Sequence, residues 1–596
     1  MEKFFSIRTI FGFTASTNDK KIFYITNTSG SPQIWSIPIE GGWADQISTW
    51  RDSVKHIYHN PVSKELLFLS DTTGNENLQI FKMPEEGGDV TLLTEGFEDS
   101  QCFFHQFNKK GNKFIFSTNK RLKYNFDVYI QDMKSGDNIL LKEFDGVYPT
   151  HAEAWSPDER YITFLKFYGN INLDILLYDT KDNTLSNVTE HDISMNVFNA
   201  ATNFDKKSKG FYFISDEGRE FKGIKYYDIK KKISKWIVKE KWDVTGFKFS
   251  TDRNYLLWTT NVNGSNSPKL LNMKTGKVRK LKLPKGNYSE LKFTKDNKKI
   301  IFLSDNPLSP GDIFVYDLRK ETSKQITNSL VGGVSKKGLT KPKDVFYKSF
   351  DGLKIHALLY IPRGLKKDGN NPAIVWPHGG PEHQEMHNFS KYVQVMVNAG
   401  YIVIAPNFRG STGYGKTFQK MIYKDWGGAE FKDVLGSVGY LKDSGYVDEK
   451  KIGVVGGSFG GFMTMTCITK SPEIWKCAID IFGPANLFTF INSVPEHWKN
   501  GVAQLIGDAE KDKDMLMERS PINFVENINC PLLVVQGKHD PRVVEDESLQ
   551  IVNKLKEKNK PVEYILLEDE GHGYSKVANQ IRVFESKLKF LDKYLR

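Results

Sequence analysis

Cysteine is scarce in this sequence. Only Cys102, Cys467, Cys477 and Cys530 occur among 596 residues, and no two of them form a C-x-x-C pair. Their wide and irregular spacing excludes a disulfide-rich scaffold and gives no support to a zinc site. We therefore expect four reduced thiols, a cytoplasmic location, and neither a metal nor an organic cofactor.

Long apolar runs and runs of one charge are also absent. No stretch approaches the roughly 18 uninterrupted apolar residues of a membrane span. The opening residues, MEKFFSIRTIFGF, place Arg8 where a signal peptide needs an apolar core. Basic residues number 83 and acidic residues 72, which gives a net charge of +11 on a mixed surface. We expect no membrane association and no nucleic-acid partner.

A repeated unit runs from about residue 20 to residue 330. Each unit has a β-rich run such as KIFYITN or ELLFLSD, a polar turn, and a second run such as QIWSIP or QIFKMP. The second runs recur every 40–50 residues or so, which is typical of propeller blades. Seven units favour a seven-bladed β-propeller over a β-sandwich with coincidental spacing. Their anchor positions are Ile34, Ile80, Val128, Ile175, Ile224, Lys269 and Ile313.

The pattern changes near residue 340. Two leading strand-like runs are followed by apolar strands such as PAIVWPHGG, YIVIAPNFRG and PLLVVQGKHD, most of them separated by segments of helix length. Apolar strands that alternate with helices predict a mostly parallel, doubly wound sheet of the α/β class. We expect a propeller with a short N-terminal segment at residues 1–335 and a second domain, of the α/β class, at residues 336–596.

A glycine-rich turn surrounds Ser458 in the stretch KIGVVGGSFGGFMT. Gly456, Ser458 and Gly460 form a G-x-S-x-G motif between an apolar strand and a helix-like segment. This strand–turn–helix setting is that of a nucleophile elbow, in which a strained serine exposes its hydroxyl. A phosphate-binding loop would need a Gly-Lys-Ser/Thr ending, which the turn lacks.

A serine nucleophile needs a base and an acid, in the chain order Ser, acid, His. Asp540 follows the strand PLLVVQGKHD, and His572 follows VEYILLEDEGHG, so both lie at carboxyl ends of predicted strands. Other candidates fit less well: His539 adjoins the acid and is interpreted as a loop residue, and three further acids crowd the loop of the base itself (Glu568, Asp569 and Glu570). We predict the triad Ser458–Asp540–His572.

The reaction also needs hydrogen-bond donors for an oxyanion. The backbone N–H of Phe459, directly after the serine, is the first candidate. For the second donor two alternatives remain open: the backbone of Gly380 in the His378-Gly379-Gly380-Pro381 loop, and the phenol of Tyr414 in NFRGSTGYG. Both residues also have a purely structural interpretation: Gly380 could simply make a tight turn, and Tyr414 could simply pack against its neighbours.

The motifs NFRGSTGYG, GGSFGG, HDPRV and DEGHG occur in one order. With them the whole chain resembles the prolyl oligopeptidase family of serine peptidases, in which a seven-bladed propeller accompanies an α/β-hydrolase domain. The HGGP and RGSTGYG motifs resemble its acylaminoacyl-peptidase branch most. The resemblance implies that Tyr414 donates to the oxyanion, that Arg542 holds a substrate carbonyl, and that Val543 faces the pocket for the residue before the scissile bond.

The substrate pocket is expected near the loop after CAIDIFG, with Phe488, Phe490 and Trp498 as candidates whose alternative role is packing in the core. The dipeptidyl-peptidase branch grips a free amino terminus with a glutamate pair. The pair Glu85-Glu86 lies in a turn, EEGG, and is interpreted as solvated, which disfavours obligatory dipeptide release.

The sequence therefore predicts a serine oligopeptidase that hydrolyses short peptides through an acyl-enzyme, with release of N-acylated amino acids as the finer hypothesis. An esterase or small-amide hydrolase with the same triad is the alternative, and an inactive propeller scaffold is a remote one. Relatives often self-associate through the hydrolase domain, so the resemblance also implies a homo-oligomer.

Overall fold

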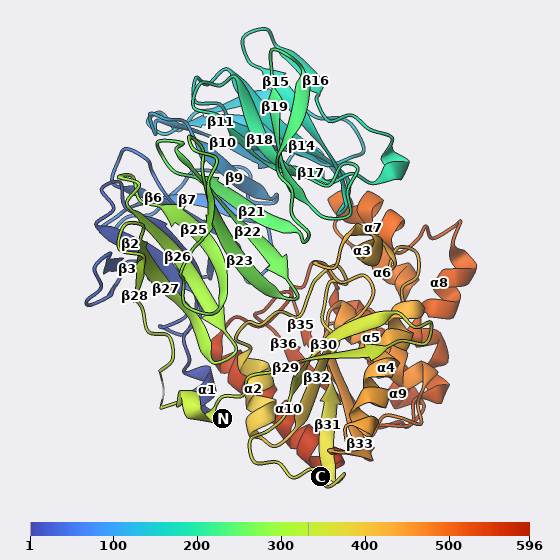
Figure 1. Ribbon diagram of the computed structural model, residues 1–596. Coiled ribbons are helices and arrows are strands. Elements are labelled where there is room, and N and C mark those ends of the chain that lie inside the picture. Colours follow the sequence, from blue (N-terminus) through green and yellow to red (C-terminus); the bar gives the residue numbers. More distant parts are fainter. Residues whose placement is uncertain (1, 332) are drawn as a thin grey trace.

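The computed structural model describes residues 2–331 and 333–596, which form two regions side by side (Figure 1). Strands β1–β28 form seven four-stranded antiparallel sheets, each made from four consecutive strands. This confirms the predicted seven-bladed propeller. The strands, in chain order and four to a blade, are β1 (Ile10–Ala15), β2 (Lys21–Thr26), β3 (Gln33–Pro38), β4 (Asp45–Gln46), β5 (Val54–His59), β6 (Glu65–Ser70), β7 (Gln79–Pro84), β8 (Thr91–Leu92), β9 (Cys102–Phe107), β10 (Lys113–Thr118), β11 (Asp127–Asp132), β12 (Asn138–Lys142), β13 (Thr150–Trp155), β14 (Tyr161–Gly169), β15 (Asn172–Asp179), β16 (Thr184–Asn187), β17 (Asn199–Phe204), β18 (Gly210–Ser215), β19 (Gly223–Asp228), β20 (Ile233–Val238), β21 (Val244–Phe249), β22 (Tyr255–Val262), β23 (Ser265–Asn272), β24 (Val278–Lys280), β25 (Asn287–Phe293), β26 (Lys299–Asn306), β27 (Ser309–Asp317) and β28 (Thr322–Gln325).

The anchor position predicted for the sixth repeat is wrong by one residue. In β3 the anchor Ile34 pairs with Ile25, the fifth residue of β2. In the sixth blade the fifth residue of the second strand is Thr259, and it pairs with Pro268 instead of Lys269. Pro268 is buried and takes the apolar position of the repeat, whereas the polar character of its neighbours hid the register in the sequence.

The propeller ring closes without exchanging a strand, because the first and last blades are each formed from contiguous residues. Phe13 and Ile22 of the first blade pack with Ile301 of the last blade in one apolar cluster. Glu290 accepts a hydrogen bond from the Phe13 N–H at 3.3 Å, and Lys292 donates to the Phe13 carbonyl at 2.5 Å. Side-chain packing and these hydrogen bonds hold the two ends of the ring together.

The second region is an eight-stranded sheet in the order β29-β30-β32-β31-β33-β34-β35-β36. β29 and β30 are antiparallel to their neighbours, and the pairs from β32 to β36 are parallel. This is the α/β-hydrolase fold that the sequence predicted. The strands are β29 (Lys343–Lys348), β30 (Lys354–Tyr360), β31 (Asn371–Val375), β32 (Ile402–Asn407), β33 (Val447–Gly457), β34 (Cys477–Ile481), β35 (Leu532–Gly537) and β36 (Val562–Leu567).

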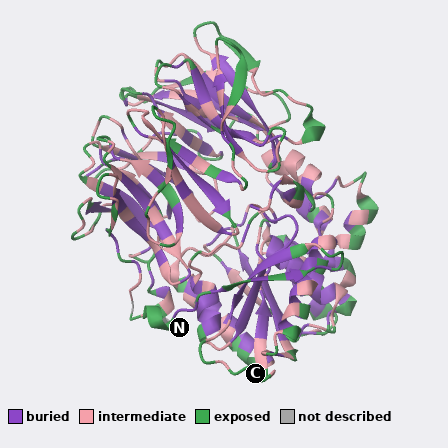
Figure 2. Cartoon of the chain, viewed as in Figure 1, coloured by how far each residue is buried: buried purple, intermediate pink, exposed green. Residues whose placement is uncertain are grey.

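Helices cover both faces of this sheet, and its strands are the most deeply buried part of the domain (Figure 2). Apolar residues of α4, α5 and α9 pack on one face, and those of α2 and α10 pack on the other. Because successive strand residues point to opposite faces, the near-continuous apolar strands of the sequence are what such a sheet needs. The helices are α1 (Glu2–Phe5), α2 (Lys391–Asn398), α3 (Lys416–Lys420), α4 (Ala429–Asp443), α5 (Phe459–Lys470), α6 (Leu487–Ser493), α7 (Lys499–Leu505), α8 (Lys513–Arg519), α9 (Glu545–Glu557) and α10 (Val577–Leu595), with 3₁₀ turns η1 (Ile193–Met195), η2 (Lys336–Gly338), η3 (Glu496–Trp498) and η4 (Pro521–Asn527).

The N-terminal segment packs against the hydrolase region instead of the propeller. Phe5 lies against Val395 of α2 and Phe584 of α10, with its ring centroid 5.1 Å from that of Phe584. The next residues then enter the propeller, since the Arg8 N–H donates to the carbonyl of Ser329 near the end of the last blade. The N-terminal segment therefore contacts both regions, the hydrolase region through Phe5 and the propeller through Arg8.

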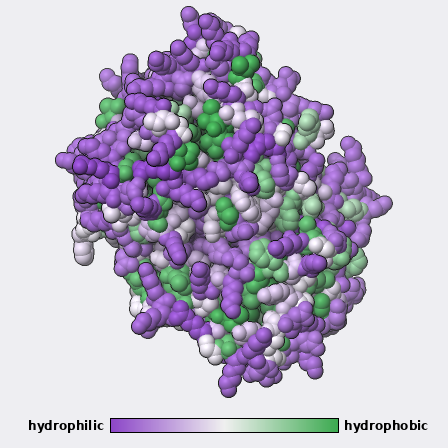
Figure 3. Space-filling view, in the orientation of Figure 1, coloured by the Kyte–Doolittle hydropathy of each residue, from purple (hydrophilic) through white to green (hydrophobic). Residues whose placement is uncertain are grey.

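The surface is mixed in character, as the composition predicted. Hydrophilic residues predominate on the face shown in Figure 3, with apolar residues interspersed among them. Among the helices that the structure describes, none carries an apolar segment sufficient to cross a membrane.

A buried ion pair holds the loop after β32. The guanidinium of Arg409 donates to both carboxylate oxygens of Asp433 at 2.8 Å and to Asp351 at 2.9 Å. The Asp433 side chain is fully buried, so its charge depends on this arginine.

Arg409→Ala should lower the free energy of unfolding by about 3–5 kcal/mol, because it leaves the charge of Asp433 buried without a partner. Urea unfolding followed by circular dichroism measures the loss. The matched control is Arg51→Ala, since Arg51 is largely exposed and its ion pair with Asp52 should contribute less than about 1 kcal/mol. Equal effects of the two substitutions would contradict this account.

Candidate active site

Ser458 lies in a tight turn between β33 and α5. Its backbone has φ 57° and ψ −123°, a conformation that is strained for a residue with a side chain. The turn is possible only because Gly456 and Gly460 have no side chains. A Cβ on Gly456 would lie 2.2 Å from the carbonyl oxygen of Gly460, and a Cβ on Gly460 would lie 2.3 Å from the carbonyl oxygen of Pro377. The structure thus has the geometry of a nucleophile elbow at the predicted serine.

The other two predicted triad residues meet Ser458 at the carboxyl edge of the sheet. His572 Nε2 lies 3.1 Å from Ser458 Oγ, and His572 Nδ1 lies 2.6 Å from Asp540 Oδ2. Asp540 follows β35 and His572 follows β36, so three separate loops supply the three side chains. The line hydroxyl–imidazole–carboxylate is the arrangement that activates a serine.

Backbone donors hold the carboxylate of Asp540 in place. Its Oδ1 accepts the N–H groups of Arg542 at 2.9 Å and Val543 at 3.0 Å, which leaves Oδ2 for the imidazole. The side chain is fully buried. The orientation of His572 is therefore fixed from behind by a carboxylate that cannot easily turn.

The competing candidates from the sequence are engaged elsewhere. Glu570 accepts hydrogen bonds from Ser575 and Lys576, and Asp569 pairs with the ammonium of Lys576 at 2.6 Å. Glu568 is largely exposed, and so is His539.

The HGG loop lies directly against the nucleophile. A Cβ on Gly379 would lie 3.4 Å from the Cβ of Ser458. His378 anchors this loop, because its Nδ1 is 2.7 Å from the Gly379 carbonyl oxygen and its Nε2 is 2.8 Å from Ser411 Oγ. Burial lowers the pKa of His378 to about 3, so the ring is neutral in this role. Gly380 follows in the same loop.

Phe459 is the first residue of α5, so its N–H has no acceptor within the helix and the positive end of the helix dipole lies beside Ser458. Tyr414, one of the two alternatives for the second donor, makes contacts elsewhere. The Tyr414 hydroxyl lies 2.5 Å from Nδ1 of His356, whose Nε2 lies 2.9 Å from Asp344. This hydroxyl is already committed to β30, and we therefore revise the expectation for Tyr414: the contacts favour the Gly380 loop, together with Phe459, as the source of oxyanion donors.

Arg542 has a partner that the sequence did not reveal. Its Nε donates to Oε1 of Glu76 at 2.8 Å, and its guanidinium lies 5.5 Å from the ring centre of Trp498. Glu76 belongs to the propeller loop between β6 and β7, in a polar stretch, TTGNEN, that carries no motif. No sequence signal could have found it, because the contact joins residues 466 positions apart.

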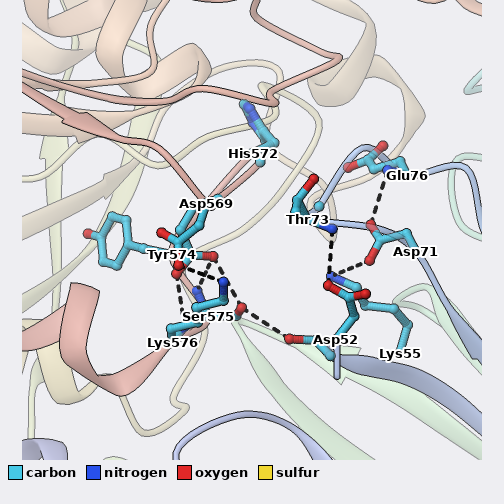
Figure 4. A pocket seen from close by; sticks show the side chains of 15 residues that line it. Asp52, Lys55, Asp71, Thr73, Glu76, Asp569, His572, Tyr574, Ser575 and Lys576 are labelled. Carbon is cyan, nitrogen blue, oxygen red and sulfur yellow. Dashed lines mark hydrogen bonds and ion pairs between the residues drawn. The ribbon is translucent and has the colours of Figure 1, made fainter. Parts of the chain in front are cut away.

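The same propeller loop touches the loop that carries His572. A Cβ on Gly74 would lie 2.7 Å from the backbone nitrogen of Gly571, so the two backbones are in direct contact. A small polar cavity of about 100 Å³ lies beside this contact, with Glu76 and Thr73 on its propeller side and His572 and Tyr574 on its hydrolase side (Figure 4). The propeller therefore borders the site at His572.

A larger cavity of about 440 Å³ lies between blades three and four and the segments α6, η3 and α7. Of the predicted pocket residues, Phe490 and Trp498 line it. Phe488 packs against the core cluster and Val543 is buried in it, and neither lines this cavity. The role predicted for Val543 stays a prediction. Gly380 also lines the cavity, so it opens beside the HGG loop.

The Glu85-Glu86 pair lies in a turn of the second blade. Glu85 lies 2.9 Å from Nε2 of His59, and Glu86 pairs with Lys21 at 3.3 Å. Both contacts are internal to the propeller. Within residues 2–331 and 333–596, no cluster of three or more His, Cys, Asp or Glu side chains could hold a metal ion.

Comparisons with known proteins agree with this geometry. Residues 387–596 match the model of the prolyl oligopeptidase family. Among curated proteins, dipeptidyl aminopeptidase BIII of Pseudoxanthomonas mexicana is 38% identical over 242 residues, which are 39% of this chain and 35% of that protein. Matches to the first relatives span between about a third and a half of their length.

Solved structures extend the similarity of fold to the whole chain. A puromycin-hydrolyzing peptidase of Mycobacterium tuberculosis superposes with a TM-score of 0.85 at 17% identity, covering 99% of this chain and 95% of its own. An acylaminoacyl peptidase of Pyrococcus horikoshii gives a TM-score of 0.74 at 19% identity, covering 99% and 97%. Residues 387–596 therefore match the prolyl oligopeptidase family, and the solved structures share the fold of the whole chain.

Proposed function

We propose that this protein is a serine peptidase that hydrolyses short peptides through an acyl-enzyme on Ser458. One observation carries the proposal: the hydrogen-bonded line from Ser458 through His572 to Asp540, at 3.1 and 2.6 Å, at the edge of an α/β-hydrolase sheet. The family match supports peptides as the substrates.

In the proposed reaction His572 Nε2 takes the proton of Ser458 as the hydroxyl attacks the substrate carbonyl. Asp540 stabilises the imidazolium that forms. The negative charge on the carbonyl oxygen meets the N–H of Phe459 and the backbone of the Gly380 loop. His572 then gives its proton to the leaving amine, and a water activated in the same way releases the acyl group.

The contacts of the propeller support small substrates. Gly74 and Glu76 touch the histidine and arginine loops, and Asn170 of the fourth blade donates to Glu382, two residues beyond Gly380, at 2.6 Å. Because propeller contacts border the site on both sides, we infer that the site takes short peptides in preference to folded proteins.

We further propose that the preferred substrates have a blocked amino terminus and release an N-acylated amino acid. A free ammonium needs a carboxylate that is not already neutralised. Glu76 is neutralised by Arg542, and the oxygens of Glu382 accept hydrogen bonds from Asn170, Gln419 and Tyr423. The second candidate is dipeptide release, because several relatives are named dipeptidyl peptidases and Glu76 would then receive the ammonium.

Ester or small-amide hydrolysis by the same triad remains the alternative activity, and an inactive scaffold the remote one. A cytoplasmic location also stays a proposal, supported by four cysteines that are all free and buried. Self-association through the hydrolase domain stays a prediction.

Ser458→Ala should abolish both covalent labelling by a fluorophosphonate probe and peptide turnover, because it removes the nucleophile. In-gel fluorescence and a peptide-hydrolysis assay measure the two effects. Ser135→Ala, in an exposed turn of the third blade, is the control and should label normally. Labelling that persists in Ser458→Ala would end the proposal, and absence of labelling in the unaltered protein would favour a scaffold.

Asp540→Asn should lower kcat by about 10⁴-fold with little change in KM. The asparagine oxygen can still accept the Arg542 and Val543 N–H groups, while its amide turns a donor toward His572 and stabilises the wrong tautomer. Asp569→Asn is the matched control, since Asp569 pairs with Lys576 at the surface of the same region and should keep kcat within about threefold of the unaltered protein. Steady-state kinetics on one peptide substrate gives both values.

Matched peptide anilides with an acetylated and a free amino terminus test the substrate subclass. We expect kcat/KM to be at least about tenfold higher for the acetylated member, because an unpaired ammonium in the site is costly. The Glu76→Gln variant should still have the higher kcat/KM for the acetylated substrate. Glu86→Gln, in another turn of the second blade, is the control. A preference for the free amine that Glu76→Gln abolishes would establish the second candidate instead.

A further inference from the structure

The 440 Å³ cavity is uncharged although it lies between two charged domains. None of its lining residues is Asp, Glu, Lys or Arg. Phe103, Phe126 and Phe167 form part of its propeller wall, and Trp426 and Trp498 form part of its hydrolase wall. Its volume is within the range of ligand pockets, and its rings are typical of a site for an apolar group.

This cavity lies next to the catalytic residues. The Trp426 ring packs edge-on against Phe459, the neighbour of Ser458, with the centroids 4.6 Å apart. Gly380 in its wall belongs to the HGG loop, and the Trp498 ring lies under the guanidinium of Arg542. When a substrate carbonyl is bound for attack by Ser458, the side chain of the residue that carries this carbonyl therefore lies within reach of the cavity.

Two imidazoles give the aromatic wall a polar component. His151 stacks on Phe126 with centroids 5.1 Å apart and meets the edge of Phe167 at 4.7 Å, and His497 meets Phe126 at 5.3 Å. Burial lowers the pKa of each histidine to about 4, so both rings are neutral near pH 7. A neutral imidazole carries one donor and one acceptor.

Neither imidazole uses these groups within the part of the chain that the structure describes, where their contacts are with other rings. The other polar groups of the cavity differ, because the Tyr168 hydroxyl donates to Asp174 at 3.0 Å and the Asn170 amide donates to Glu382. Both imidazoles are only partly buried, so a ligand that fills the cavity displaces solvent from them and must supply their hydrogen bonds itself. A ligand that is aromatic and also carries a hydrogen-bonding group meets both requirements.

We propose that this cavity binds the side chain of the residue that supplies the acyl group, and that it selects aromatic side chains with a polar edge, tyrosine and tryptophan. Phenylalanine fits the rings but leaves the imidazoles unpaired. Small aliphatic side chains leave most of the cavity empty, and charged side chains find no counter-ion. The inference rests on the proposed peptidase function and makes propeller residues part of the specificity site.

A series of N-acetyl-X 4-nitroanilides, each paired with its free-amine form, tests the selection in the unaltered protein. We expect kcat/KM for X = Tyr and Trp to exceed that for Ala by about 100-fold and that for Phe by about fivefold. Lys and Glu should be the poorest substrates. Equal turnover of Ala and Tyr would overturn the proposal.

Two substitutions test the role of the imidazoles. His151→Phe and His497→Phe keep a ring but remove its donor and acceptor, so the Tyr/Phe ratio of kcat/KM should fall toward one while the Phe substrate is retained. His56→Phe replaces an exposed propeller histidine outside the cavity and should leave the ratio unchanged. A ratio unaltered by both cavity substitutions would overturn the proposal.

Labelling of Ser458 by a fluorophosphonate distinguishes the possible failures. Each variant is compared at equal labelling rate, so loss of folding is not mistaken for loss of selection. If the unaltered protein does not label, the peptidase function itself fails. If it labels and hydrolyses simple esters without any preference among side chains, the function stands and this inference falls.

Discussion

The imidazole of His572 is held between two oxygens, 2.6 Å from Asp540 and 3.1 Å from Ser458, and the rest of the active site depends on this arrangement. Its parts come from loops after three different strands, so only the assembled sheet brings them together. The strained backbone of Ser458 fits between β33 and α5 because Gly456 and Gly460 leave room for the tight turn.

The propeller takes part in this assembly as more than a cover. Gly74 lies against the backbone of Gly571 beside His572, and Glu76 binds Arg542 beside Asp540. Asn170 binds the segment that follows the HGG loop. Each of the three loops around the carbonyl site therefore has a propeller contact nearby, and a change in the relative position of the domains would act on all of them together.

The sequence was most informative where one strand or one turn carries the signal alone. The second and third strands are apolar in most blades, with β23 as an exception, and the elbow around Ser458 has an unambiguous setting. Several fourth strands are short and exposed, as in β4 and β8, so no pattern marks them. The first strands contain irregular register, which hides their alternation.

The contacts between distant parts could not be predicted in the same way. Glu76 lies in a polar loop without a motif, and only the packing of two domains brings it to Arg542. Tyr414 has the spacing that the resemblance requires, yet its hydroxyl is hydrogen-bonded to His356. His151 looked like any strand residue, because its place in a cavity depends on helices some 350 residues later in the chain.

Ser458 and His572 act as one catalytic unit in the proposed reaction, and a double-mutant cycle tests this most directly. In a unit, removing either residue costs about as much as removing both. We therefore predict that kcat falls to the same level in Ser458→Ala, His572→Ala and the double variant. Losses that add up, or a single variant that keeps most of its activity, would contradict it.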